Sequence, residues 1–425
     1  MAKGSNRPQV VVIGAGFAGW WAARAVARSL VEVTILDSNN YHTFLPLLYQ
    51  VAAAEVEPEE IVYPIRSMLR RHTNVAFALV DVESVDVDSH TVIAGERRFH
   101  YDYLVVAPGS TSNFFGIKGA SEHCFPLKTL EEGSSLRNRI LCCFERACLE
   151  PDAEVRGRIL TFAIVGGGST GVEFAGALNE LVRGPLMKDY KSLSPDEVRI
   201  VLFEANPALL QGLPHRLSEY AVARLRRMGV DVRLGATVGE ITHNSVVLND
   251  GSVIWSETVV WTAGVRGADL GEKSGMPLAR GGRVAVTPTL QVPGHPEIYV
   301  AGDLAYMEQD GAPLPMLAPV AMQQGTAAGT NIVRQVARQD AIPFRYHDKG
   351  TMATIGRNAA VALLAGRTFT GFPAWIVWVM VHILYLIGFR NRIFVLINWA
   401  WDYFLYERTV RLILPGSPGE SRKCG

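Results

Sequence analysis

The chain has 425 residues, 48% of them hydrophobic and 19% charged, and its 41 basic and 41 acidic residues give a formal net charge of zero. This length and hydrophobic content allow two to three domains with substantial cores and exclude a disordered or fibrous chain. Because no long basic block interleaved with aromatic residues occurs, we expect no nucleic-acid partner. The five cysteines form no CxxC pair and no metal-ligand spacing, so we expect no metal site.

The N-terminal segment predicts a dinucleotide-binding βαβ unit. A buried strand over residues 9–13 leads through a glycine-rich turn into an alanine-rich helix over 17–30 and a second strand over 32–36. In such a unit the glycines permit a tight turn, close approach of the backbone to a pyrophosphate, and close helix–strand packing. An acid about 20 residues after the last glycine can accept hydrogen bonds from a ribose diol, although a solvated strand-end acid is the alternative. The candidate residues are Gly14, Gly16, Gly19 and Asp37.

A third apolar strand is predicted over residues 103–106. It runs into the turn Ala107-Pro108-Gly109, whose small residues let a backbone pass close to a cofactor, so Ala107 and Gly109 are further cofactor-binding candidates. A charged, moderately amphipathic helix is expected over 129–149.

The βαβ pattern then repeats. A strand over 159–165, a second glycine turn, a helix over 172–182 and a strand over 199–203 predict a second dinucleotide site at Gly166, Gly168, Gly171 and Glu204. The residues after this acid are Ala205-Asn206-Pro207, with no arginine or lysine positioned for a 2′-phosphate. The second nucleotide is therefore predicted to be NADH rather than NADPH.

Two later strands also end in small-residue turns. The strand over 259–262 leads to Ala263 and Gly264, and the strand over 297–300 leads to Gly302 and Asp303. A carboxylate in the last position can bind a ribityl hydroxyl while nearby backbone N–H groups meet a pyrophosphate. The chain would thus return to its first domain, making the second an insertion.

These motifs, in this order, resemble the two-dinucleotide-binding flavoproteins of the pyridine nucleotide:disulfide oxidoreductase superfamily. The resemblance reaches to about residue 345 and implies that the first domain holds FAD, with Asp37 and Asp303 as contacts, and that the inserted one holds NADH, with Glu204 as a contact. The predicted fold class is α/β, with two Rossmann-like dinucleotide-binding domains, the second inserted in the first, plus a C-terminal amphipathic helical membrane anchor. The predicted boundaries are 8–125 and 281–345 for the FAD-binding domain, 126–158 for a connecting helix, 159–280 for the NADH-binding domain and 346–425 for the membrane-anchoring region.

One segment indicates the subgroup. Disulfide reductases carry a cysteine pair beside the flavin, whereas residues 41–52 read Tyr-His-Thr-Phe-Leu-Pro-Leu-Leu-Tyr-Gln-Val-Ala, without a thiol. This segment is similar to that of the type II NADH dehydrogenases, the single-subunit NADH:quinone oxidoreductases. So are residues 171–176, 260–267 and 350–357.

The resemblance implies roles for Glu173 and Gln323, and Gln50 is a third catalytic candidate. Glu173 would orient the nicotinamide or the flavin, although a carboxylate early in a helix can simply favour the positive helix end. Gln323 keeps the second glutamine of the Ala-Gln-x-Ala-x-Gln motif near the quinone site, whereas Pro319 replaces the first, so this chain departs from the family pattern there. Gln50 and His382 are weaker candidates for a quinone tunnel, and a histidine in an apolar helix is more often a packed residue.

The C-terminal region predicts attachment to a membrane surface. Apolar stretches over 375–387 and 393–406 are separated by Arg390-Asn391-Arg392, and a helix of about 15 residues spans only about 20 Å of the ~30 Å hydrocarbon core. Two short interfacial helices fit better, with Asn398 and Asp402 on one face and an excess of basic residues for anionic lipid. A hydrophobic dimer interface or a buried core helix is the alternative. Since residues 1–8 are short and polar, we also expect no secretory signal peptide.

The sequence therefore predicts FAD-dependent oxidation of NADH, with two electrons passed to a membrane quinone and no proton pumping. We expect a peripheral, monotopic protein on the cytoplasmic face of a membrane that forms a homodimer. One alternative is a sulfide:quinone oxidoreductase, which would need cysteines flanking the flavin, yet no cysteine occurs between Cys148 and Cys424. The other is a membrane-docked flavoprotein that senses NADH and acts through partner interactions.

Overall fold

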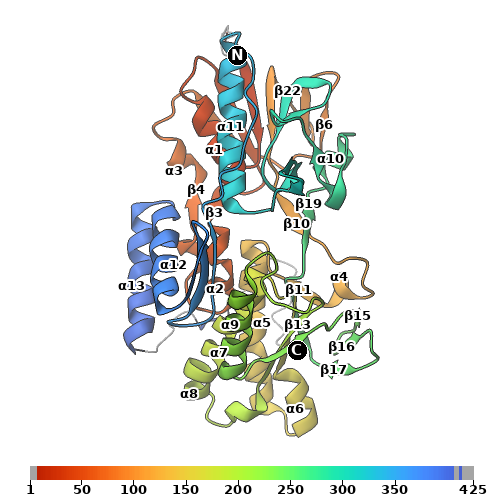
Figure 1. Ribbon diagram of the computed structural model, residues 1–425, viewed down its shortest axis with the longest axis vertical. Coiled ribbons are helices and arrows are strands. Elements are labelled where there is room, and N and C mark those ends of the chain that lie inside the picture. Colours follow the sequence, from red (N-terminus) through yellow and green to blue (C-terminus); the bar gives the residue numbers. More distant parts are fainter. Residues whose placement is uncertain (1–6, 406–410, 414–425) are drawn as a thin grey trace. The chain divides into compact units, whose positions relative to one another are not determined.

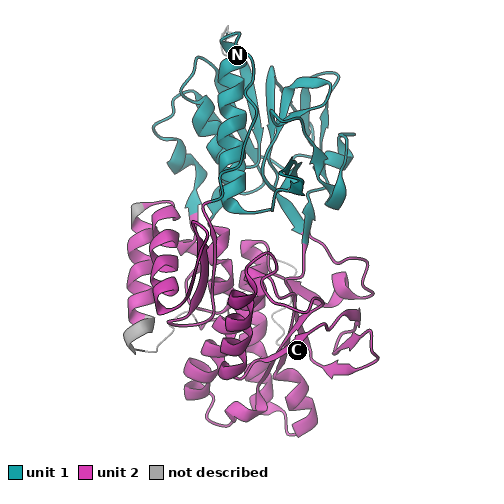
Figure 2. Ribbon diagram, viewed as in Figure 1, with its two compact units in different colours: residues 1–43, 63–111, 265–348 teal, residues 44–62, 112–264, 349–425 magenta. Residues whose placement is uncertain are grey.

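The computed structural model describes residues 7–405 and 411–413, without the side chains of residue 389 and residues 402–405. The chain forms two compact units (Figures 1 and 2). Unit 1 comprises residues 1–43, 63–111 and 265–348, and unit 2 comprises residues 44–62, 112–264 and 349–425. Unit 2 therefore takes up the short segment 44–62 and the C-terminal region in addition to the inserted βαβ repeat.

Unit 1 contains a six-stranded sheet in the order β21-β22-β9-β1-β2-β5. All neighbouring strands are parallel except β21 and β22. Buried valine, isoleucine and leucine side chains on both faces explain why these strands read as continuous apolar runs. The bounds are β1 (Gln9–Ile13), β2 (Glu32–Asp37), β5 (Val75–Leu79), β9 (Tyr103–Val106), β21 (Gln291–Val292) and β22 (His295–Val300).

Helices α1 (Phe17–Val26) and α11 (Ala318–Val336) pack side by side in unit 1 (Figure 1). Their contact depends on small residues, because a Cβ on Gly325 would lie 2.1 Å from the carbonyl oxygen of Ala18. A Cβ on Gly329 would lie 2.6 Å from that of Ala22. Helix α1 ends at Val26, earlier than the predicted limit of residue 30.

Unit 2 contains a five-stranded parallel sheet in the order β11-β18-β12-β13-β14. The order β18-β12-β13-β14 repeats the order β9-β1-β2-β5 of unit 1, so the predicted βαβ repeat extends to four strands. Helix α7 (Ser169–Leu181) follows β12, and the long helix α5 (Leu130–Leu149) is capped by Thr129, whose side chain accepts from the Glu132 N–H. The strand bounds are β11 (Cys124–Pro126), β12 (Thr161–Val165), β13 (Arg199–Glu204), β14 (Asp231–Leu234) and β18 (Thr258–Trp261).

The C-terminal region of unit 2 begins with an antiparallel sheet, β26 (Thr351–Thr354), β27 (Ala360–Leu364) and β28 (Arg367–Gly371). Two helices follow, α12 (Phe372–Tyr385) and α13 (Phe389–Leu405). The prediction that residues 390–392 interrupt the helices is wrong, because the break lies at residues 386–388 and these residues are helical. The Arg392 side chain donates to the carbonyl oxygens of Leu384 and Leu386, which satisfies the end of α12 from the first turn of α13.

Candidate functional site

The first fingerprint turn lies in unit 1 between β1 and α1. A Cβ on Gly14 would lie 2.2 Å from the Ala107 carbonyl oxygen, and one on Gly19 would lie 1.8 Å from the Gly14 carbonyl oxygen. A Cβ on Gly16 would meet no atom of the described residues within 4 Å. Packing within the protein thus requires Gly14 and Gly19, whereas Gly16 leaves open the space that a pyrophosphate needs.

The Asp37 carboxylate is held by the same turn. Its Oδ2 accepts from the Ala15 N–H at 2.6 Å and its Oδ1 from the Asn39 N–H at 2.7 Å. Burial raises the pKa of Asp37, although both N–H donors lower it. Each carboxylate oxygen has a further lone pair, so Asp37 can still accept a hydrogen bond from a ribose hydroxyl.

His42 lies beside the fingerprint turn and is a residue that the sequence reasoning did not assign to the site. Its Nδ1 is 2.8 Å from the Ala15 carbonyl oxygen, so this nitrogen carries the hydrogen, and burial lowers the pKa of the ring. The neutral ring then presents Nε2 as an acceptor, which is buried and has no partner among the described residues. An orphaned acceptor at this turn fits a ligand that supplies hydroxyl groups.

The other predicted flavin turns meet in unit 1. The Gly302 N–H donates to Oε1 of the buried Gln324 at 2.8 Å, and the Ser110 hydroxyl donates to Asp303 Oδ2. The NH2 group of Gln324 is buried without a partner in the described part of the chain. Gly109 has a positive φ of 84°, with open space where its Cβ would lie. The residues predicted for FAD therefore lie around the first fingerprint turn, where there is space for a pyrophosphate and where polar groups of His42 and Gln324 lack a partner among the described residues. These features fit the cofactor.

Gln323 has a different environment from the one expected. Its Nε2 donates to the His347 carbonyl oxygen and its Oε1 accepts from the His347 N–H, both at 3.0 Å. Both ends of the amide thus hold the loop after α11. Pro319 occupies the first turn of α11, where a missing N–H costs nothing.

The second fingerprint turn, in unit 2, repeats these devices. A Cβ on Gly166 would lie 2.5 Å from the Ala263 Cα, and one on Gly171 would lie 1.9 Å from the Gly166 carbonyl oxygen. A Cβ on the middle glycine, Gly168, would again have no neighbour within 4 Å in the part of the chain that the structure describes. The geometry therefore fits a second pyrophosphate.

Glu204 matches Asp37 in position. Its Oε2 accepts from the Gly167 N–H at 2.7 Å, and its Oε1 accepts from the Asn206 N–H at 2.8 Å and from the Asn206 side-chain amide at 2.6 Å. Three donors fix this carboxylate at the end of β13, beside the turn.

Gly264 follows β18 in the neighbouring turn. A Cβ there would lie 2.6 Å from the ring of Phe115, which is 61% exposed and has a positive φ of 52°. This aromatic residue lies at the carboxyl end of the parallel strands, the edge where such sheets bind ligands.

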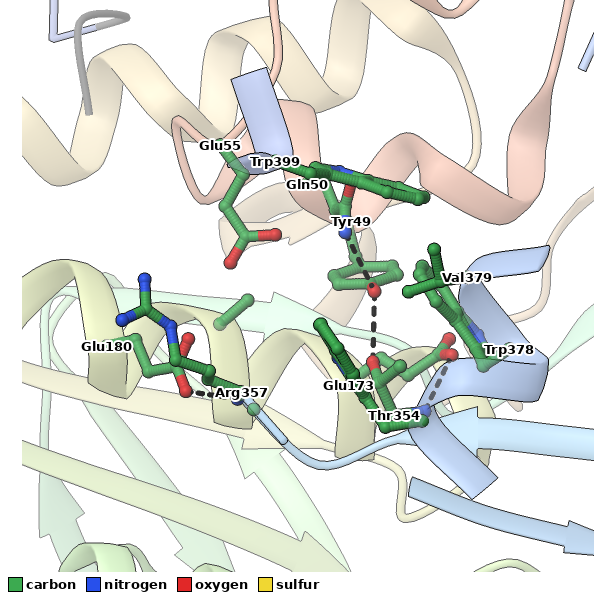
Figure 3. A pocket seen from close by; sticks show the side chains of 13 residues that line it. Tyr49, Gln50, Glu55, Glu173, Glu180, Thr354, Arg357, Trp378, Val379 and Trp399 are labelled. Carbon is green, nitrogen blue, oxygen red and sulfur yellow. Dashed lines mark hydrogen bonds between the residues drawn. The ribbon is translucent and has the colours of Figure 1, made fainter. Parts of the chain in front are cut away.

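A small cavity of about 80 Å³ lies in unit 2 and contains two of the predicted catalytic residues, Gln50 and Glu173 (Figure 3). Its walls come from the segment 44–62, α7, β26, α12 and α13. Trp375, Trp378 and Trp399 supply aromatic surface, and Glu55, Glu180 and Arg357 supply charge. Hydrogen bonds connect Gln50 through Tyr49 and Thr354 to Glu173. Gln50 Nε2 lies 3.2 Å from Tyr49 Oη, and Tyr49 Oη lies 3.0 Å from Thr354 Oγ1. The Thr354 backbone nitrogen lies 3.2 Å from Glu173 Oε1.

Burial dominates the electrostatics of Glu173. It raises the pKa of this carboxyl to about 8, although the Thr354 N–H and the Trp378 indole N–H lower it. Among the described residues the indole nitrogen meets no acceptor with good hydrogen-bond geometry, so it acts as a nearby dipole. At pH 7 Glu173 is therefore mostly a neutral acid. An interaction with the positive end of α7 would lower the pKa of Glu173, so the raised value shows that burial outweighs any such interaction.

His382 does not line this cavity. Its ring stacks on Trp378 with centroids 4.0 Å apart, and its Nδ1 bonds to the Trp378 carbonyl oxygen at 2.8 Å. Burial lowers the pKa of His382 to about 4, so the ring is neutral. The structure thus agrees with the packed-residue alternative.

The sequence reasoning did not single out Tyr49, Thr354, Trp378 or Trp399 as members of the site. Tyr49 and Thr354 lie in segments that resemble the type II enzymes, so closer attention to their hydroxyl groups could have found them. The tryptophans were interpreted only as interfacial residues. Nothing in the sequence around them signals a cavity wall.

Comparison with known proteins assigns the class first. Residues 8–325 match the family described as pyridine nucleotide-disulphide oxidoreductase, and residues 348–408 match the NDH2 C-terminal domain. The chain belongs to the pyridine nucleotide-disulphide oxidoreductases, as the two fingerprint turns indicate.

Within that class the chain belongs to the type II NADH dehydrogenases. It is 37% identical to a type II NADH:quinone oxidoreductase of Mycobacterium tuberculosis, over 96% of this chain and 90% of the relative. It is 30% identical to a type II NADH:quinone oxidoreductase of Staphylococcus haemolyticus, over 87% of this chain and 92% of the relative. These matches confirm the predicted family.

Solved structures agree on the fold. NDH2 from Plasmodium falciparum in complex with NADH superimposes with a TM-score of 0.89 at 18% identity, covering 96% of this chain and 100% of that one. The sulfide:quinone oxidoreductase of Aquifex aeolicus gives 0.72 at 20% identity, with coverage of 94% and 96%. These superpositions confirm the predicted α/β fold class.

Proposed function

We propose that this protein oxidises NADH and reduces a membrane quinone, with FAD as its cofactor. The observation that carries the proposal is the 37% identity to a type II NADH:quinone oxidoreductase over nearly the whole chain. The two fingerprint turns, each with space at its middle glycine, provide independent support.

In unit 1 the flavin nucleotide would be held by Gly14, Gly16, Gly19, Asp37, Ala107, Gly109, Gly302 and Asp303. Bound FAD would supply a carrier that accepts two electrons from one substrate and passes them to another. The protein's contribution is to bind and orient, with the backbone of the open turn toward the pyrophosphate and the Asp37 carboxylate toward the ribose.

In unit 2 NADH would be held by Gly166, Gly168, Gly171, Glu204, Ala263 and Gly264. The fixed Glu204 carboxylate can accept from both ribose hydroxyls, and it would repel a 2′-phosphate. We therefore propose NADH rather than NADPH as the electron donor.

Glu173 is proposed to hold a proton for the acceptor reaction. Oxidation of one NADH with reduction of one quinone to quinol consumes one proton from water, because NADH brings two electrons and a single hydrogen. A neutral carboxylic acid in a small polar cavity can hold that proton at neutral pH, and Gln50 would orient the hydrogen bonds around it. Gln323 stays a candidate for the acceptor side only through the resemblance.

The C-terminal helices are proposed to bind a lipid surface. Helix α13 places Asn391 and Asn398 against the protein, where they donate to Val62 and Glu60, while Phe394 and Ile397 are 44% and 53% exposed. Met380 and Leu384 of α12 are likewise exposed. Polar side chains inward and apolar side chains outward are what an interfacial helix requires. Among the described residues no helix is both long and apolar enough to cross a bilayer. The cytoplasmic face and a homodimer remain predictions.

The test of function is stopped-flow spectroscopy of the flavin-loaded protein. NADH should bleach the flavin absorbance, and a soluble quinone should restore it, at rates well above about 1 s⁻¹. A protein that senses NADH without catalysis would turn over far more slowly. Fast quinone reduction with sulfide in place of NADH would instead support the sulfide:quinone alternative.

Lipid binding is tested by two variants with an internal control. Leu384→Glu and Ile397→Glu place charges on the exposed apolar faces, so sedimentation with anionic vesicles should fall while NADH-dependent reduction of ferricyanide is retained. Unchanged sedimentation of both variants would argue against the lipid surface.

A further inference from the structure

Helix α13 contacts the segment 44–62 through three polar side chains. Asn391 Nδ2 donates to the Val62 carbonyl oxygen at 2.7 Å, and Asn398 Nδ2 donates to Glu60 Oε1 at 2.5 Å. The third contact reaches the cavity, because Trp399 Nε1 donates to Gln50 Oε1 at 3.0 Å. The helix that presents apolar side chains to the outside is thus also bonded to a proposed catalytic residue.

Trp399 sets the direction of the hydrogen bonds in the cavity (Figure 3). An indole N–H can only donate, so the Gln50 amide must turn its oxygen toward Trp399 and its NH2 toward the Tyr49 hydroxyl. The Tyr49 hydroxyl, which accepts from Gln50, shares a hydrogen bond with Thr354 Oγ1 in which either hydroxyl can donate, and the Thr354 backbone N–H donates to Glu173. The three bonds of defined direction, donated by Trp399, Gln50 and the Thr354 backbone, all run along this series toward Glu173.

The indole ring is itself fixed by packing. Trp399 lies against Trp378 with ring centroids 5.4 Å apart, and Trp378 is only 2% exposed. Gln50 is 6% exposed, so water cannot easily replace the bond that Trp399 makes.

We infer that Trp399 is a positioning residue, whose indole N–H fixes Gln50 and, through Tyr49 and Thr354, the environment of Glu173. Helix α13 is therefore part of the functional site as well as a surface helix. The consequence for quinone reduction depends on the proposed function, whereas the consequence for the Glu173 carboxyl does not.

Other charged or titratable groups also lie around Glu173 and must be held constant in any test. Tyr49 and Glu55 come from the segment 44–62, Glu180 comes from α7, and Arg357 follows β26. His382 of α12 packs on Trp378 and is neutral. The substitutions below change none of these groups.

The experiment compares Trp399→Phe with Trp401→Phe in the flavin-loaded full chain. Both remove one indole from α13, but Trp401 is 49% exposed and is not a lining residue of the cavity. The first readout is the pH at which Glu173 is half protonated. It is measured from the infrared carbonyl band of the neutral acid, and the band is assigned by its absence in Glu173→Gln. Trp399→Phe should raise the proton affinity of Glu173 by roughly two- to tenfold, the range of one net hydrogen bond, and so move the midpoint to higher pH. The reason is that donors aligned toward the carboxylate stabilise its charged form, and this variant loses their alignment. Trp401→Phe should leave it unchanged.

The second readout separates positioning from general loosening. In a Gln50→Leu background, Trp399→Phe should have no further effect on the midpoint or on flavin reoxidation by a soluble quinone. Trp401→Phe should bleach with NADH as the unmodified protein does, and flavin content and melting temperature serve as folding controls in every variant.

Additive effects of the two substitutions, or equal midpoints in Trp399→Phe and Trp401→Phe, would overturn the inference. If no variant reduces quinone, including the unmodified protein, the proposed function fails, yet the infrared midpoints still decide the role of Trp399.

Discussion

The two fingerprint turns have the same backbone but different side chains. In each, the first and last glycines are required by backbone contacts within the protein, the middle glycine faces open space, and a strand-end acid accepts from the second residue of the turn. In unit 1 that pair is Ala15 with Asp37, and in unit 2 it is Gly167 with the longer Glu204. Two residues after the last glycine, unit 1 has Trp21 whereas unit 2 has Glu173. The shared features therefore serve nucleotide binding, and the differences show where each unit is specialised.

The largest expected effect separates folding from binding. Gly19→Ala places a Cβ 1.8 Å from a backbone oxygen that cannot move away, so it should destabilise the protein by about 3 kcal/mol or more. Gly16→Ala meets open space and should keep the fold while losing flavin. Melting temperature and flavin absorbance distinguish the two, and Gly171→Ala with Gly168→Ala repeats the test in unit 2. Equal melting temperatures for Gly19→Ala and Gly16→Ala would contradict this interpretation.

The comparison also shows what the sequence could and could not predict. Each turn depends on residues close together in the chain, so the glycines, Asp37 and Glu204 were recognisable from spacing alone. The cavity combines residues as far apart as Tyr49 and Trp399, and no local pattern indicates that these segments meet. Asn398 is a further example, since its partner, Glu60, is more than 300 residues earlier.

The second prediction concerns Glu173, which occupies in unit 2 the position that Trp21 has in unit 1. Burial raises the pKa of Glu173 from its ordinary value of 4.5 to about 8, so the folded chain keeps a proton that the unfolded chain releases. The free energy of unfolding should therefore fall as pH rises from about 4.5 to 8. Glu173→Gln removes this dependence and should be more stable than the unmodified protein by on the order of 4 kcal/mol at pH 8, with no difference below pH 4.5.

The same variant should reduce quinone slowly at every pH, because an amide cannot deliver a proton, while bleaching by NADH continues. The unmodified protein should lose quinone reduction as pH rises through about 8. Trp21→Phe, at the equivalent position of unit 1, is the matched control and should keep both pH profiles. A stability profile of Glu173→Gln parallel to that of the unmodified protein would refute the protonated state.

The third prediction concerns the contact between the second residue of each turn and its strand-end acid, and it converts the Gly167–Glu204 pair of unit 2 into the Ala–Asp pair of unit 1. A Cβ on Gly167 would lie 2.9 Å from Glu204 Oε2 and 2.4 Å from Leu209 Cδ2, so Gly167→Ala should raise the KM for NADH by about tenfold. Adding Glu204→Asp recreates the Ala–Asp pair of unit 1 and should restore part of that loss. Ala15→Gly should change flavin affinity little. If Glu204→Asp makes the Gly167→Ala variant worse, the two turns are not equivalent in this way.

The smallest expected effect distinguishes the two asparagines that follow the strand-end acids. One asparagine lies two residues after Asp37 and the other lies two residues after Glu204. The backbone N–H of both Asn39 and Asn206 donates to the acid, but only the Asn206 side chain donates as well, while that of Asn39 reaches Ser38 at 3.5 Å. Asn206→Ala should therefore raise the KM for NADH about threefold, the loss expected for one net hydrogen bond, and Asn39→Ala should leave flavin affinity unchanged. Titration of each variant with its own nucleotide measures both effects. Because NAD⁺ must leave after each turnover while FAD stays bound, a third donor on Glu204 keeps the empty site ordered between substrates. Equal losses of nucleotide affinity in both units would contradict this distinction.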